Sequence, residues 1–158
     1  MMKFYLFGLS LLFSLSCHSF ENSGRFGLGA TSQTYQNLPA ISLKIHFSEK
    51  SAMGTYFSYR GTEEASYNFG VRYYNSIVSE PNLIFYGVLS GGILQTYNGT
   101  TSSSGYEGSI HFGTEFFFEE IKHIGLSFEA GISMTNIDEF IFETSASHIF
   151  NSAIHFYF

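Results

Sequence analysis

Six long charged side chains occur at alternating positions within short, strand-like segments of this 158-residue chain. Successive side chains of a β-strand point to opposite faces, and each of these charges shares its face with glycine, serine or threonine. Inside a closed sheet an unpaired charge is costly, so charges of opposite sign are expected to meet. We therefore predict an interior charge network made of Lys44, Arg60, Arg72, Glu107, Glu115 and Glu129. Arg60 and Glu107 are expected near one end, and the other four nearer the middle.

A serine, a histidine and an acid also occur close together near the C-terminus. Ser145, Ser147 and His148 follow Glu143, and such residue types can act as nucleophile, base and orienting acid. In an extended strand, however, Ser147 and His148 point to opposite faces. We therefore interpret them as polar residues at a strand end and predict no catalytic residue.

Three histidines share the polar faces of the segments: His46, His111 and His155. A metal site would need all three at one height. His111 is expected in a different half from the other two, so we predict no metal site and no cofactor.

The segments that carry these residues show period-2 alternation, which is typical of β-strands. Eight of them occur, at about residues 24–34, 39–48, 52–61, 65–75, 83–97, 105–118, 123–135 and 145–158. The apolar faces contain no charged residue. In the fifth segment both faces are apolar or glycine, so its orientation stays open. The proposed outer connections contain residues 33–37, 61–64, 98–104 and 136–144, and the inner ones contain residues 49–51, 76–81 and 119–122.

Side-chain size indicates which face is inside. Eight rows of Phe, Leu, Ile and Tyr would overfill the interior of an eight-stranded barrel, whereas Gly, Ser, Thr and a few long charges fit it. Aromatic residues make up 19% of the chain and charged residues 13%, with a mean hydropathy of +0.07. Neutral mean hydropathy with many aromatics is what alternating lipid-facing and lumen-facing residues produce. The bulky face is therefore predicted to point outward, against lipid.

The N-terminus has the pattern of an export signal. A short region with Lys3 precedes an apolar stretch over residues 4–15, and small residues then allow cleavage before Phe20. We predict a signal peptide over residues 1–19 and a barrel domain over residues 20–158. Cys17, the only cysteine, has lipid attachment as an alternative role.

The C-terminal segment ends on alternating aromatics. Ile154, Phe156 and Phe158 share one face, and Tyr157 lies on the other. We predict that these four residues form the assembly signal of a closing strand.

The signal peptide, the eight alternating strands and the terminal Tyr157-Phe158 together resemble the small bacterial outer-membrane barrels, the class of the OmpA membrane domain and OmpX. The resemblance implies an all-β, eight-stranded antiparallel up-and-down transmembrane β-barrel in the bacterial outer membrane. It also implies contact with outer-membrane lipids, lipopolysaccharide and the barrel-assembly machinery.

The expected function is non-enzymatic: a monomeric barrel with a charge-plugged lumen and surface loops for structural or adhesive contacts. A net charge of −6 with no basic patch argues against nucleic-acid binding. The alternatives are a lipid A-modifying barrel enzyme, a narrow porin-like pore, and a soluble lipocalin-like binder of reversed polarity.

Overall fold

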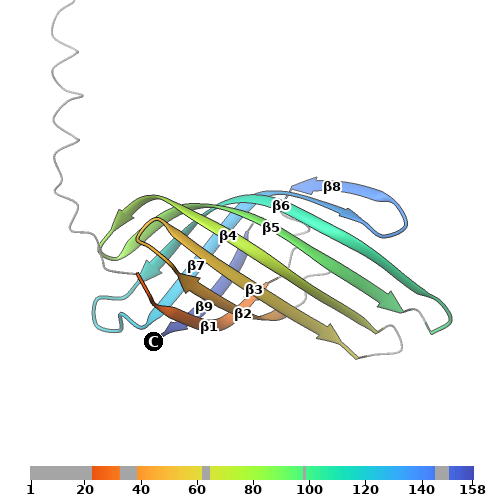
Figure 1. Ribbon diagram of the computed structural model, residues 1–158, viewed down its shortest axis with the longest axis horizontal. Coiled ribbons are helices and arrows are strands. Elements are labelled where there is room, and N and C mark those ends of the chain that lie inside the picture. Colours follow the sequence, from red (N-terminus) through yellow and green to blue (C-terminus); the bar gives the residue numbers. More distant parts are fainter. Residues whose placement is uncertain (1–22, 33–38, 62–64, 98, 145–149) are drawn as a thin grey trace, which may run out of the picture.

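The computed structural model describes residues 23–32, 39–61, 65–97, 99–144 and 150–158. They form nine β-strands (Figure 1): β1 (Phe26–Ser32), β2 (Pro39–His46), β3 (Ser51–Arg60), β4 (Ser66–Glu80), β5 (Leu83–Tyr97), β6 (Ser102–Phe117), β7 (Ile124–Asn136), β8 (Phe140–Thr144) and β9 (Asn151–Tyr157). In this part of the chain, no helix is long and apolar enough to cross a membrane. The predicted signal peptide and Cys17 lie outside the described residues.

The strands close into an antiparallel barrel. Each strand from β1 to β7 pairs with the next in sequence, and β9 pairs with β1 on one side and with β7 on the other. β7 pairs with β9 over residues 124–129 and with β8 over residues 132–136, so β8 and β9 share one position in the wall. Nine strands in eight positions confirm the predicted all-β, eight-stranded antiparallel barrel.

The shared position contains an offset in register. Ile132 pairs with Thr144 and Glu129 pairs with Asn151, so three steps along β7 correspond to seven steps along the partner. The partner chain therefore has four more residues than the ladder needs at this point. Figure 1 shows β8 running beside β7 at the end of the barrel opposite the C-terminus.

The prediction of a connection over residues 136–144 was wrong in part. Residues 140–144 form β8 instead, and only residues 137–139 separate it from β7. Phe140, Ile141 and Phe142 favour extended structure, and the ladder of β7 offers them backbone partners.

Two other connections are shorter than predicted. β4 runs on to Glu80 through a register shift between Ser76 and Val78, which leaves Pro81 and Asn82 as the turn. β6 begins at Ser102, because ladder hydrogen bonds come from the backbone and need no bulky side chain. The long wall formed by β4, β5 and β6 results from these extensions.

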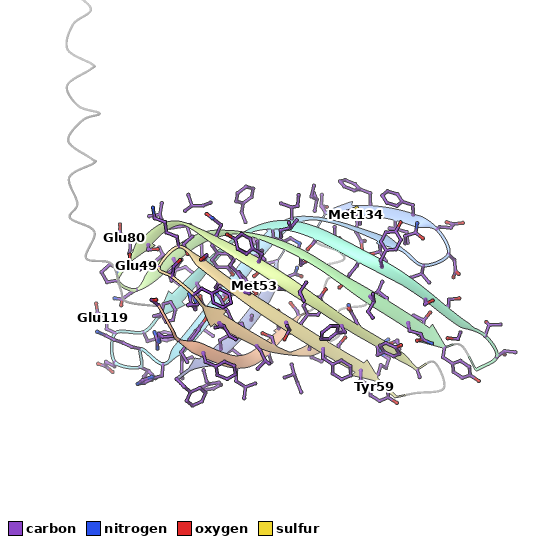
Figure 2. All side chains as sticks on the ribbon, viewed as in Figure 1. Glu49, Met53, Tyr59, Glu80, Glu119 and Met134 are labelled. Atoms are coloured by element: carbon purple, nitrogen blue, oxygen red, sulfur yellow. The ribbon has the colours of Figure 1, made fainter. Side chains whose placement is uncertain are left out.

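Burial separates the two faces of the wall. Bulky apolar side chains point outward and remain exposed, such as Val71 at 48% and Phe112 at 68%. Polar and charged side chains point inward, and Glu115 is 0% exposed. Figure 2 shows Met53 and Tyr59 on the outer wall, and places Glu49, Glu80 and Glu119 together at the end where the turns after β2, β4 and β6 lie. We call this the turn end.

The fifth strand, whose orientation the sequence left open, has a mixed interior face. Ile84, Tyr86, Val88 and Leu94 point inward and are buried, whereas Phe85, Leu89 and Ile93 are exposed. Three of the inward residues belong to an apolar and aromatic cluster inside the barrel, made of Ala52, Tyr74, Ile84, Tyr86, Val88, Phe117 and Tyr157. The interior therefore contains more apolar and aromatic side chains than the predicted filling of Gly, Ser, Thr and a few charged residues.

Candidate functional site in the barrel interior

The first ion pair of the interior joins β2 to β6. Lys44 Nζ lies 2.7 Å from Glu115 Oε2, and the two side chains are 3% and 0% exposed. The hydroxyl of Tyr157, on β9, donates to the other oxygen of Glu115 at 2.6 Å. A Cβ at Gly125 would lie 2.7 Å from the same carboxylate, so only glycine leaves room for it on β7. Three strands far apart in sequence thus meet at one carboxylate.

The second ion pair joins β4 to β7. Arg72 Nη1 lies 3.1 Å from Glu129 Oε2, and both side chains are buried. The hydroxyl of Tyr86, on β5, donates to Glu129 Oε1 at 2.9 Å. This site therefore repeats the composition of the first: a cation, a carboxylate and a tyrosine hydroxyl from three different strands.

The remaining two members of the predicted network lie apart from these pairs. Glu107 accepts hydrogen bonds from the hydroxyl of Tyr56 and from Asn68 Nδ2, the latter at 2.9 Å. Arg60 is exposed at the end of β3. The structure thus brings four of the six charges together as two pairs, and gives Glu107 neutral partners.

Three buried tyrosines connect the charged groups to one another. Each donates its hydroxyl to a carboxylate, and each ring also lies against a different cation. The distances from cation to ring centroid are 5.0 Å for Arg25 and Tyr157, 5.0 Å for Lys44 and Tyr86, and 5.3 Å for Arg72 and Tyr56. We call Tyr56, Tyr86 and Tyr157 the tyrosine ladder. Cation–π contacts are stronger where water is excluded, so the ladder adds a second contact to Lys44 and Arg72, which pair with carboxylates, and to Arg25, which donates to a backbone carbonyl.

The tyrosine ladder was not predicted from the sequence, although a signal for it exists. All three tyrosines share the inward parity of the charged residues. A buried tyrosine hydroxyl usually finds a hydrogen-bond partner, and a carboxylate facing the same interior is such a partner.

Arg25 closes the interior at the turn end. Its Nη2 donates to the carbonyl oxygen of Lys122 at 2.8 Å, which ties the residue before β1 to the connection before β7. The guanidinium also lies 5.9 Å from the ring centroid of Phe117. A positive group held between two rings and a carbonyl therefore covers this end of the polar interior.

The interior histidines contact tyrosine and serine. The rings of His46 and His155 lie 5.6 Å and 6.0 Å from the ring of Tyr157, and His155 Nε2 lies 2.5 Å from Ser42 Oγ. His111 Nδ1 lies 3.3 Å from Ser109 Oγ. Among the described residues, no group of three His, Cys, Asp or Glu side chains could hold a metal ion.

The other predicted site residues fall partly outside the described chain. Ser145, Ser147 and His148 lie outside it, and Glu143 is a half-buried residue of β8. In the predicted assembly signal, three residues point outward and one points inward. Ile154 is 36% exposed, Phe156 47%, Phe158 78% and Tyr157 1%.

No protein-family model matches the chain, and no curated protein matches it in sequence. In fold, the chain is similar to the N-terminal β-barrel domain of OprF from Pseudomonas aeruginosa, known from a crystal structure. The two share a TM-score of 0.59 over 86% of this chain and 98% of that domain, with 9% identical residues. At this identity the similarity concerns the fold alone.

Proposed function

We propose that the chain is a small outer-membrane β-barrel protein of Gram-negative type, non-enzymatic and monomeric. Its interior is a charged plug, and its surface loops make structural or adhesive contacts. The observation that carries the proposal is the inverted polarity of the barrel: ion pairs inside and bulky apolar side chains outside.

The outer wall supports the membrane location. Its exposed side chains include Ile41 at 64%, Leu89 at 56% and Ile110 at 52%, from strands on different sides of the barrel. Soluble monomers rarely expose contiguous apolar patches beyond a few hundred Å². A closed barrel satisfies its own backbone hydrogen bonds, which is the condition for β-structure in lipid. The fold similarity to the OprF barrel domain fits this proposal.

The interior supports a plug. An eight-stranded barrel is only wide enough for its own side chains to fill. The two ion pairs, the tyrosine ladder and Arg25 cross this space from different strands. Such a barrel acts by being rigid and anchored: lipids, including lipopolysaccharide, surround its wall, the barrel-assembly machinery inserts it, and the loops opposite the turn end face the outside.

Dependence on detergent tests the proposal. We expect the full chain to refold only in detergent micelles or lipid vesicles, because water cannot cover the exposed apolar wall. The folded barrel should migrate differently from the boiled protein on a gel, since a closed barrel binds less denaturing detergent. Protein that stays folded and monomeric after complete removal of detergent would contradict the membrane location and favour a soluble binder.

A further inference from the structure

A small cavity lies inside the barrel where β3 to β7 face one another. Except for one glycine, every residue around it is polar. The lining residues are Tyr56, Arg72, Ser90, Glu107, Gly108, Ser109 and Ser133. The cavity lies between the Arg72–Glu129 pair and the hydrogen bonds of Glu107, so it separates two parts of the interior network.

Two polar atoms of the lining have no hydrogen-bond partner among the described residues: Ser133 Oγ and Arg72 Nε. Both residues are buried, at 3% and 5% exposure. A buried polar group without a partner costs about 1–3 kcal/mol, and more if it is charged. The other hydroxyls of the lining have hydrogen-bond partners, since Ser90 Oγ and Ser109 Oγ lie 2.5 Å apart and the hydroxyl of Tyr56 donates to Glu107. The cavity is therefore lined by a hydroxyl on β7 and an N–H group on β4 that lack hydrogen-bond partners.

The size of the cavity selects its occupant. It leaves about 10 Å³ for the centre of a water-sized sphere. A cavity needs at least roughly 10–15 Å³ to hold one water molecule, and that water needs two to four polar partners. The size of the cavity therefore suits one water molecule.

The chemistry of the lining points to the same occupant. Arg72 Nε can only donate a hydrogen bond, and the carboxylate of Glu107 can only accept one. A halide could accept from Arg72 but would be repelled by Glu107. A hard cation would be repelled by Arg72, and it prefers six or more oxygen ligands. Water both donates and accepts, so it alone satisfies both ends of the cavity.

We infer that this cavity is a binding site for one ordered water molecule, which accepts from Arg72 Nε, exchanges a hydrogen bond with Ser133 Oγ and donates to the carboxylate of Glu107. The water joins the Arg72–Glu129 pair to Glu107, so the polar interior becomes one connected system from β3 to β7. The inference rests on the proposed polar plug and names the component that completes it.

The test is a crystal structure of the detergent-solubilised barrel at a resolution that shows ordered water, together with two variants. Ser133→Val removes the hydroxyl and fills the cavity with methyl groups. Ser127→Val is the matched control, because Ser127 is also a buried serine on β7 but does not line the cavity. We expect one density peak at hydrogen-bond distance, roughly 2.7–3.2 Å, from both Ser133 Oγ and Arg72 Nε. The peak should persist in Ser127→Val and disappear in Ser133→Val.

Two results would overturn the water site. One is an empty cavity in a well-ordered wild-type map. The other is an ion at that position, seen as an anomalous peak after soaking with bromide or caesium. Either result in a barrel that still needs detergent to fold would leave the proposed function standing. If Ser133→Val fails to fold, the wild-type map and the milder Ser133→Ala decide the question.

Discussion

At the scale of single residues, Glu115 is the side chain on which the interior depends most. It is fully buried, pairs with Lys44 and accepts from Tyr157. We predict that Glu115→Ala destabilises the barrel by about 3–5 kcal/mol, because it leaves a buried ammonium group without its counter-charge. Urea unfolding in lipid vesicles measures this change. Replacing both partners, as Lys44→Met with Glu115→Gln, should recover most of the loss, since no buried charge then remains unpaired. If Glu115→Ala were as stable as the wild type, the central role assigned to Glu115 would be contradicted.

At the scale of elements, β9 is the strand that closes the barrel. Phe158 extends its pairing with β1: its N–H donates to Phe26 O at 2.8 Å, and Phe26 N–H donates back at 3.3 Å. We predict that deleting Phe158 lowers the yield of folded barrel in the membrane while export continues, because the seam loses this pair and its outward ring. Phe150→Ala is the control, because Phe150 is also an exposed phenylalanine but precedes β9, far from Phe158. Heat-modifiability in membrane fractions measures the yield, and an unchanged yield for the truncated chain would refute the prediction.

At the scale of the whole molecule, the filled interior predicts a barrel that does not conduct ions. In planar bilayers we expect no discrete conductance steps from the wild type, because four buried charges and four buried tyrosines occupy a space only as wide as side chains. Glu129→Ala or Lys44→Ala empties part of that space and should permit small steps. Glu119→Ala, at the exposed turn end, should stay silent. Steps in the wild type that grow in Glu129→Ala would favour a narrow pore over a plug.

Local alternation was sufficient to predict the barrel, because side-chain parity is fixed by the strand itself. The segment expected over residues 83–97 has the bounds of β5, and the closed antiparallel architecture agrees with the prediction. Alternation assigns each side chain to a face, but it does not show which residues on that face contact one another. Lys44 and Glu115 are 71 residues apart in sequence, and their contact depends on how the tilted strands stagger when the barrel closes. The same stagger gave Glu107 neutral partners, with Arg60 exposed at the end of β3.

β8 was missed for a different reason. Its aromatic residues follow polar ones in a stretch that is typical of a connection. Its pairing with β7 is a contact between strands, which the local sequence pattern does not show. The tyrosine ladder was missed because tyrosine occurs on both faces: Tyr59 and Tyr67 are exposed, whereas Tyr56 and Tyr74 are buried. To place a tyrosine, its position in the alternation must be considered together with the buried groups that its hydroxyl can reach.

The four-residue offset between β8 and β9 has a consequence for how this part of the wall can slip. Four is an even number, so Phe140 and Phe142 on β8 face outward like Ile154 and Phe156 on β9. Each of the two strands takes its facing from its own pairing with β7, so a slip of two residues along β7 would keep every outward side chain on the outer face. A slip of one residue would turn the slipped strand around, and in β9 it would place Phe156 inside and Tyr157 outside. Misregistered forms of this part of the wall should therefore differ from the native pairing by two residues.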